Sequence, residues 1–189
     1  MPKSHTLSKV LVVLIGFLAL SYTHVYAARF VVSQDASSKK VGDTFRATVY
    51  LDTQGISANA GEASISFPSD KVEVESISTS NSIFSMWVEQ PTYSNDIGVV
   101  RFNGGAPNPG YTGAQGRVLQ INYRIKSPGT GSLSFGNASI LANDGLGSDI
   151  HTQSPSSSFT IGETPVPQEE TKPVQQAVTT SKAIPAPII

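Results

Sequence analysis

The strongest constraint on the fold is a strict alternation of apolar and polar side chains in two segments, residues 44–53 and 117–126. Phe45, Ala47, Val49 and Leu51 share one face of the first segment, and Leu119, Ile121, Tyr123 and Ile125 share one face of the second. Successive side chains of a β-strand point to opposite faces of the sheet. The alternation therefore predicts strands with one face on a hydrophobic core.

Shorter segments of the same kind occupy most of residues 28–162. We expect strands at 28–33, 62–67, 98–103, 132–135, 138–142 and 157–161, and one that starts at Val72, where the out-of-phase Ile77 indicates a bulge or the end of the strand. A turn is expected at Ser127–Gly131. The apolar run Ile83–Val88 is either a strand or a helical turn, because it is too short for periodicity to decide. About nine short strands without helical periodicity predict an all-β fold, an antiparallel β-sandwich.

The segments on either side of residues 28–162 differ from it in composition. Residues 1–27 have a basic start, an apolar run and the small-x-small ending Val25-Tyr26-Ala27. This is typical of a secretory signal peptide cleaved after Ala27. The run Val10–Leu20 is short for a membrane span, which disfavours the alternative of an uncleaved anchor helix. We therefore expect a secreted or extracytoplasmic protein, whose mature chain has no second apolar segment and does not span a membrane.

The C-terminal residues, 163–189, contain five Pro and no aromatic residue. Such a segment cannot bury enough apolar surface to fold. It is predicted to be a disordered Pro/Thr-rich linker or tail. Either the protein continues beyond it, or the tail is itself the attachment to a surface.

Charge and cysteine content exclude several classes of function. Without residues 1–27 the chain has 11 Lys and Arg against 14 Asp and Glu, a net charge near −3, with no basic patch. Nucleic acid is therefore not an expected partner. The chain contains no Cys. Disulfides, thiolate metal sites and thiol catalysis are excluded, so the core alone must stabilise the domain.

The residues needed for catalysis are sparse. The mature chain has a single His, His151, in a polar stretch beside Ser154, where an exposed side chain is the favoured interpretation. The carboxylates of Glu62, Glu73 and Glu75 alternate outward on predicted strands, and nothing in the sequence brings two of them across a cleft as glycoside hydrolysis requires. We do not expect an enzyme.

Four short motifs resemble the cohesin family of β-sandwich modules. They are Val41–Phe45, Ile65–Val74, Phe102–Gly105 and Leu141–Gly145, and the resemblance covers roughly residues 29–162. It implies a jelly-roll sandwich of nine strands. It also implies a non-catalytic module that docks a dockerin-type protein partner, in assemblies that degrade polysaccharides on bacterial surfaces. The resemblance leaves two alternatives open, a carbohydrate-binding module that recognises polysaccharide directly and a purely structural surface domain.

The loop 143–149 is a candidate calcium site. Asn143, Asp144 and Asp149 can supply oxygen ligands, and Gly145 and Gly147 let the backbone turn tightly. Oxygen atoms of carboxylates, amides and backbone carbonyls are the ligands that Ca²⁺ prefers. The alternative is an ordinary turn, because Asp, Asn and Gly favour turns for backbone reasons. No other cofactor is expected.

Three aromatic residues are candidates for binding a sugar by stacking. They are Trp87, Tyr93 and Tyr111, and Trp87 is the only Trp of the chain. Aromatic rings bind apolar faces of ligands. For Trp87 the favoured alternative is a core residue packed with Phe84 and Val88, whereas Tyr111 is expected to be exposed.

Overall fold

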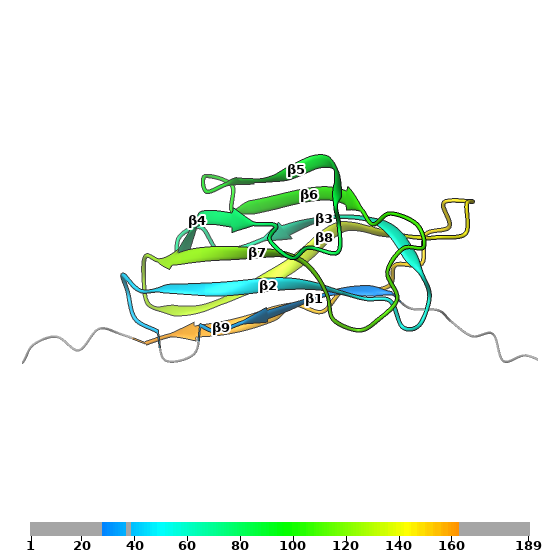
Figure 1. Ribbon diagram of the computed structural model, residues 1–189. Helices are drawn as coiled ribbons and strands as arrows, with labels where there is room; N and C mark the ends of the chain where they lie inside the picture. Colours follow the sequence, from blue (N-terminus) through cyan, green and yellow to red (C-terminus); the bar gives the residue numbers. More distant parts are fainter. Residues whose placement is uncertain (1–27, 37–38, 163–189) are drawn as a thin grey trace, which may run out of the picture.

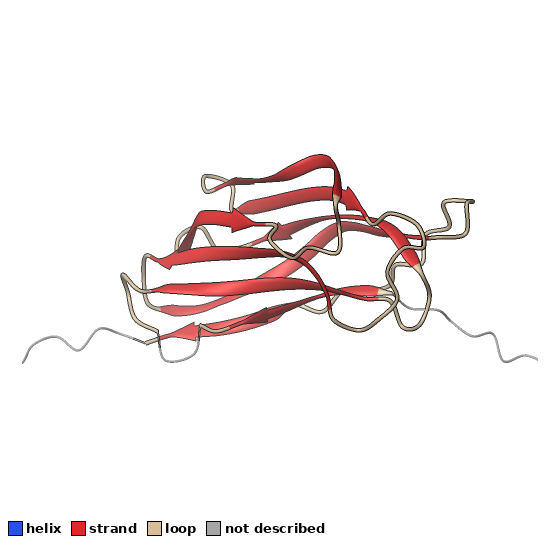
Figure 2. Ribbon diagram, viewed as in Figure 1, coloured by secondary structure: helices blue, strands red, loops and turns tan. Residues whose placement is uncertain are grey.

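The computed structural model describes residues 28–36 and 39–162, which form nine β-strands (Figure 1). The strands are β1 (Arg29–Gln34), β2 (Thr44–Asp52), β3 (Ala58–Ser66), β4 (Val72–Ser78), β5 (Met86–Ser94), β6 (Val99–Gly105), β7 (Gly116–Ile125), β8 (Gly129–Ala142) and β9 (Ser157–Ile161). Within these ranges all regular structure is strand (Figure 2), and no helix there is long and apolar enough to cross a membrane. The predicted signal peptide and tail lie outside the described residues.

The strands form two antiparallel sheets that pack as the layers of a sandwich. One sheet has the order β1-β2-β7-β4 and the other the order β5-β6-β3-β8-β9. All the pairings between these strands are antiparallel. The predicted all-β antiparallel sandwich of about nine strands is confirmed.

The two segments with strict alternation pair with each other at the centre of the four-stranded sheet. Phe45 lies opposite Tyr123, Ala47 opposite Ile121 and Val49 opposite Leu119. All eight predicted inward side chains of these segments are buried. A bulge beyond Val49 adds one residue, Val118, which is also fully buried although its phase predicts an outward position. An extra residue in one strand shifts the side-chain phase, which explains the exception.

Aromatic side chains fill both ends of the core. The Tyr123 ring stacks on Phe45 at a centroid distance of 5.1 Å and meets Phe67 edge-on at 5.3 Å. At the other end Phe30 meets Phe102 edge-on at 5.4 Å. These are the offset and edge-to-face geometries that aromatic pairs prefer. They join inner faces of both sheets into one core.

The strand β8 differs most from its prediction. The sequence predicted a turn through Gly131 and then two strands around Gly136, but β8 is continuous over 14 residues. A Cβ atom on Gly131 would lie 2.6 Å from the Phe159 ring, so this glycine accommodates β9 and does not mark a turn. The pairing with β3 shifts register between Glu62 and Ser64, where the positive φ of Asn137 marks a bulge. β8 bends there and continues.

Two other strands have different bounds from those predicted. β3 begins at Ala58, four residues before the predicted start at Glu62. The prediction missed residues 58–61 because these small residues give no clear pattern of large apolar and polar side chains. The apolar run at Ile83–Val88 contributes only its second half to β5, which continues through polar residues to Ser94. The register of β5 against β6 shifts twice along its length. Such shifts erase the period of two on which the prediction depended.

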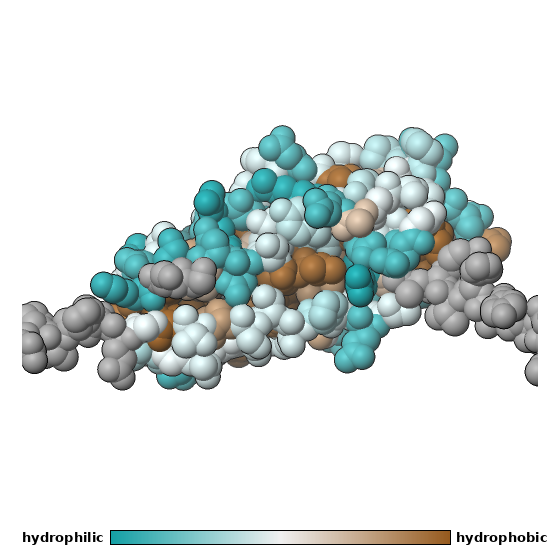
Figure 3. Space-filling model, turned by 90° about the horizontal axis from the view of Figure 1, so that it is seen from below, coloured by the Kyte–Doolittle hydropathy of each residue, from teal (hydrophilic) through white to brown (hydrophobic). Residues whose placement is uncertain are grey.

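The sandwich is closed along one side by contacts between β1 and the C-terminal part of the chain. Ala28 and His151 form a parallel bridge, as do Lys40 and Gly162, and the Gln34 side chain donates to the Ser158 carbonyl. Because the bridges are parallel, Ala28 and Gly162 lie at opposite ends of the sandwich (Figure 1). Apolar surface is visible along the middle of this side (Figure 3).

Candidate functional site

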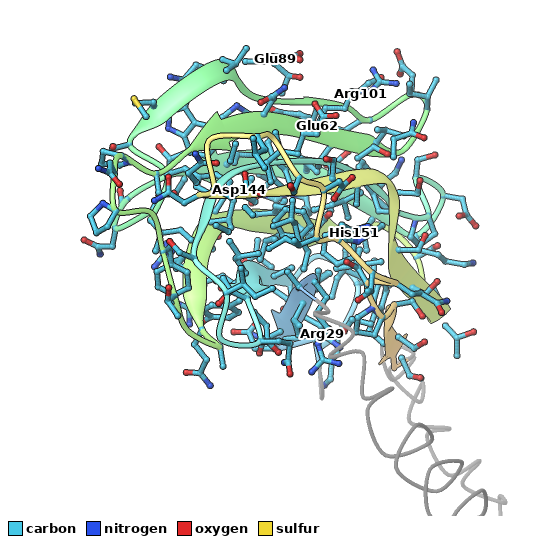
Figure 4. All side chains as sticks on the ribbon, turned by 90° about the vertical axis from the view of Figure 1, so that its right-hand side faces the viewer. Arg29, Glu62, Glu89, Arg101, Asp144 and His151 are labelled. Atoms are coloured by element: carbon cyan, nitrogen blue, oxygen red, sulfur yellow. The ribbon has the colours of Figure 1, made fainter. Side chains whose placement is uncertain are left out.

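Two rows of side chains cross the outer face of the five-stranded sheet, as its pairing register shows. The apolar row consists of Met86, Gly105, Ala60 and Leu141, and the acidic row of Glu89, Asn103, Glu62 and Ser139. Each row takes one residue from each of β5, β6, β3 and β8. Side chains directly opposite one another on neighbouring strands share a face and lie close together. The two rows therefore form one continuous surface, on which Figure 4 marks Glu62 and Glu89.

This face is hollowed at one end of the sheet. An open hollow of about 600 Å³ lies over the apolar row, and its lining also includes Val88, the loop residues 106–108, and Asn143, Gly145 and Gly147. A smaller hollow of about 150 Å³ adjoins it around Glu62 and Ser139. Met86 is 54% exposed and Val88 is 83% exposed, so both offer apolar surface to solvent. Exposed apolar surface within a polar rim is typical of an interaction site.

The wall of the hollow is held by the side chain of Asn143. Its Nδ2 atom donates to Asn108 Oδ1 at 3.1 Å and to the Pro109 carbonyl at 2.9 Å, and its Oδ1 atom accepts from Asn59 Nδ2 at 3.2 Å. The backbone N–H of Asn143 donates to the Ser57 carbonyl at 2.7 Å. One amide thus joins the two wall loops and β3, which fixes the shape of the hollow.

The charges of this face are open to a partner. The Glu62 carboxylate accepts a hydrogen bond from Asn103 Nδ2 at 2.8 Å. Arg101 stands in the next row, between Thr92 and Ser64. Within the described ranges, Glu62, Glu89 and Arg101 form no ion pair. The face therefore has an apolar half, an acidic middle and a basic edge.

The predicted calcium ligands already form hydrogen bonds within the protein, Asp144 inside its own loop and Asn143 and Asp149 to neighbouring segments. Asp144 is exposed at its tip, and its carboxylate accepts from the Leu146 N–H at 2.8 Å. Hydrogen bonds from the Ser148 hydroxyl and from this N–H lower the pKa of Asp144. Burial by itself raises the pKa of Asp149, but hydrogen bonds from the N–H groups of His151 and Ile140 and from the Ser139 side chain, together with the charge of His151, outweigh burial and lower it. Among the described residues no three His, Cys, Asp or Glu side chains group as a metal site, and calcium binding stays a prediction.

The predicted aromatic residues lie away from the hollowed face. Trp87 pairs with Gly104 and Tyr93 with Val100, both on the inner side of the sheet. The Trp87 ring meets Phe84 edge-on at 5.9 Å, which agrees with the core alternative, but Val88 points to solvent instead of packing with it. Tyr93 reaches across to the other sheet, with its hydroxyl 3.5 Å from the Glu75 carbonyl.

Tyr111 is half-buried, not exposed as the sequence predicted. Its ring covers Gly113 and Gly116, and a Cβ atom on Gly116 would lie 2.4 Å from it. Small residues beneath an aromatic ring let the ring lie flat on the backbone. The structure does not gather Trp87, Tyr93 and Tyr111 on one surface, and sugar binding by them stays a prediction.

Sequence reasoning overlooked Met86 and wrongly assigned Val88 to the core. A signal for them is present, because residues on either side of a strand residue point to the opposite face. If Trp87 packs on the core, Met86 and Val88 must face solvent, as the structure shows. Two motifs noted in the sequence, Phe102–Gly105 and Leu141–Gly145, also supply part of the hollow.

His151 is partly buried, not exposed as the sequence predicted, and its segment ties down the start of β1. Its Nε2 atom lies 3.0 Å from Ser154 Oγ, which also accepts a hydrogen bond from the Phe30 N–H at 2.9 Å. The Asp149 carboxylate bonds to the backbone N–H of His151 and not to its ring. Thr152 and Ile150 bond to the backbone of Ala28. The segment 150–154 thereby ties down the start of β1.

Comparison with known proteins gives the fold a name. No protein-family model matches the sequence, and a search of curated proteins found no match. Solved structures do match. A cohesin module from a family 33 glycoside hydrolase of Clostridium perfringens has a TM-score of 0.59 at 15% identity, over 74% of this chain and 99% of that chain. The cohesin of a type I cohesin–dockerin complex from Clostridium thermocellum has a TM-score of 0.60 at 16% identity, over 74% and 96%.

A third structure extends the similarity beyond bacteria. A non-cellulosomal cohesin from the archaeon Archaeoglobus fulgidus has a TM-score of 0.57 at 16% identity, over 76% of this chain and 94% of that chain. In all three comparisons the match spans nearly the whole of the known module. The described part of the chain is therefore a cohesin-like β-sandwich.

Proposed function

We propose that this domain is a non-catalytic docking module that binds a dockerin-type protein through the outer face of β5, β6, β3 and β8. The observation that carries the proposal is the apolar row beside the acidic row at the hollow. Interfaces combine a desolvated apolar centre with a polar rim, and Met is enriched in them. The wall fixed by Asn143 keeps the hollow preformed, which lowers the entropic cost of binding.

The chemistry of the face defines the complementary surface of the partner. An aliphatic or aromatic side chain of the partner fills the hollow over Met86 and Leu141. Basic side chains beside it meet Glu62 and Glu89, which lack ion-pair partners among the described residues. Such complementarity raises specificity and the rate of association.

The setting of the module is part of the proposal. The signal-peptide pattern in residues 1–27 supports secretion, and the Pro-rich residues 163–189 support a tethered position at a cell surface. Two of the similar structures are a module of a glycoside hydrolase and a member of a cohesin–dockerin complex. We place this module in an extracellular assembly related to polysaccharide breakdown.

A pull-down with immobilised dockerin-bearing proteins tests the function. The mature chain should be retained, and Met86→Ser and Val88→Ser should weaken retention because they remove apolar surface from the hollow. The chain offers a matched control in Ile97, which is 63% exposed in the turn between β5 and β6 and does not line the hollow. Ile97→Ser should be retained as well as the unchanged protein.

Two results would count against the proposal. Equal weakening by Ile97→Ser and Val88→Ser would mean that the hollow is not the contact surface. Absence of retention by every dockerin tested, with glycan binding through the same hollow, would favour the alternative of a carbohydrate-binding module. If the protein bound neither a dockerin nor a glycan, the remaining alternative would be a structural surface domain.

A further inference from the structure

A ladder of hydrogen-bonded polar side chains crosses the outer face of the other sheet. Arg117 Nη2 donates to Gln120 Oε1 at 3.4 Å, Gln120 Nε2 donates to Asn122 Oδ1 at 3.1 Å, and Asn122 Nδ2 donates to Ser76 Oγ at 2.8 Å. Hydrogen bonds between partly exposed side chains add little net stability, because water can replace them. Their clear consequence is that both amides are held in fixed orientations.

Each amide of the ladder keeps hydrogen-bonding capacity for a ligand. A side-chain amide has two N–H donors and an oxygen with two lone pairs. Gln120 and Asn122 each use one donor and one lone pair within the ladder. One donor and one acceptor therefore remain on each, side by side. A sugar hydroxyl both donates and accepts, so a pair of neighbouring hydroxyls matches such an amide.

An aromatic side chain and an incompletely bonded cation flank one end of the ladder. Tyr50 pairs with Arg117 across β2 and β7 and is partly exposed. The buried Nε atom of Arg117 has no hydrogen-bond partner among the described residues. A buried donor without a partner is costly, and an acceptor that reaches this Nε atom, from a ligand or an ordered water, offsets the cost.

The other end of the ladder opens into a hollow of about 410 Å³. It is lined by Asp35, Lys39, Thr44, Phe45, Arg46, Glu75, Ser76 and Asn122. Arg46 pairs with Asp35 at 3.6 Å, and Arg124 pairs with Glu75. The lining itself holds two anions, Asp35 and Glu75, against two cations, Lys39 and Arg46, so its formal charges balance. A balanced lining favours an uncharged ligand over an anionic one.

We propose that this ladder, from Tyr50 and Arg117 through Gln120 and Asn122 to the hollow, binds a neutral polysaccharide chain. The site is on the sheet opposite the hollowed docking face, so it does not depend on the proposed docking function. A module with both faces in use would hold a protein partner while it rests on the polysaccharide. The amides bond to hydroxyls and Tyr50 offers its ring to a sugar face.

Affinity electrophoresis of the mature chain tests the proposal. Native gels contain hydroxyethyl cellulose, soluble xylan or galactomannan, and a gel with polygalacturonate tests an acidic polymer. Retardation is expected in at least one neutral gel. Gln120→Ala and Asn122→Ala should weaken binding up to about tenfold each, the loss expected for a hydrogen-bonding side chain. Asn122→Asp keeps the size of the side chain but removes the donor. It serves as a second variant if the alanine variants have a lowered melting temperature.

The matched control is Asn103→Ala, which removes an amide from the docking face. It should leave retardation unchanged. No retardation in any neutral gel, retardation by polygalacturonate alone, or equal loss in Asn103→Ala and Asn122→Ala would overturn the proposal. A dockerin pull-down on the same variants separates the two faces, because Gln120→Ala and Asn122→Ala should bind that partner normally.

Discussion

Tyr123 packs its ring into the core while its hydroxyl has no hydrogen-bond partner among the described residues. Burial raises the pKa of this phenol above its ordinary value. An unsatisfied buried hydroxyl costs roughly 1–3 kcal/mol. We therefore expect Tyr123→Phe to raise the free energy of unfolding by about 1 kcal/mol, measured by urea denaturation. Tyr123→Ala, which also removes the ring, should lose about 3–5 kcal/mol. A less stable Phe variant would show that the hydroxyl is bonded.

His151 should make stability depend on pH. Burial lowers the pKa of its imidazole, and the Asp149 carboxylate opposes this only in part. The folded state therefore favours the neutral ring. Stability is at its full value above the ordinary pKa, about 6.5, and falls as the pH drops below it, because the unfolded chain takes up the proton first.

Chemical denaturation at about pH 7.5 and about pH 5.5 measures this effect. In His151→Asn the difference in the free energy of unfolding between the two pH values should be smaller than in the unchanged protein. An unchanged difference would assign the pH dependence to carboxylates such as Asp149.

The edges of strands β4 and β5 are joined by a side chain instead of by backbone pairing. Asn95 Oδ1 accepts from the Val74 N–H at 2.7 Å, and Asn95 Nδ2 donates to the Val74 carbonyl at 3.0 Å. We expect Asn95→Ala to lower the free energy of unfolding by about 1–3 kcal/mol, because two backbone groups lose their partner. Asp96→Ala, at the exposed neighbouring position, should stay within about 0.5 kcal/mol in the same denaturation experiment. Similar losses in both would remove Asn95 from this role.

The loop 143–149 carries the calcium prediction. A cation that binds only the folded protein stabilises it by RT ln(1 + [L]/Kd), about 2.7 kcal/mol at a hundredfold excess over Kd. Thermal melting of metal-stripped protein should therefore shift upward with Ca²⁺, and less with Mg²⁺, which demands tighter octahedral geometry. Asp144→Ala should abolish the shift. It is a cleaner variant than Asp149→Ala, because Asp149 also bonds to the backbone of β8. No shift and no binding heat at millimolar Ca²⁺ would leave an ordinary turn.

Strands were predictable where their sequence carries the period of the sheet. β2 and β7 alternate clearly, and apart from Val118 at the bulge their inward residues agree with the structure. β5 and β8 carry bulges, which shift the phase, and β8 contains glycines that serve its neighbours instead of turns. Local pattern cannot distinguish a glycine that allows a turn from one that makes room for Phe159.

At the scale of the whole molecule, the domain boundary is the prediction to test. We expect residues 28–162 alone to melt within a few degrees of the mature chain that includes residues 163–189. The change of composition at Gly162 motivates this expectation. Differential scanning calorimetry of the two proteins compares them directly. A fall of more than a few degrees would show that the tail contributes to the fold.

The candidate site was less predictable than the fold because it depends on pairing between distant strands. The apolar row takes residues from positions 60, 86, 105 and 141, and only the sheet order brings them together. No local pattern contains that order. The aromatic residues attracted attention as a cluster in sequence, but the pairing of β5 with β6 places Trp87 and Tyr93 on the inner side of the sheet.

The parallel bridges Ala28–His151 and Lys40–Gly162 determine from which end of the sandwich the C-terminal residues leave. Gly162 leaves the sandwich beside Lys40, whereas the hollow lies at the end where Ala28 lies, lined by the loop residues 106–108, Asn143, Gly145 and Gly147. Anything anchored through the residues after Gly162 therefore pulls from the rear of the module. A spacer of this kind extends up to about 3.1 Å per residue when it is rich in Pro. A module tethered in this way would point the end of the sandwich that carries the hollow away from the surface.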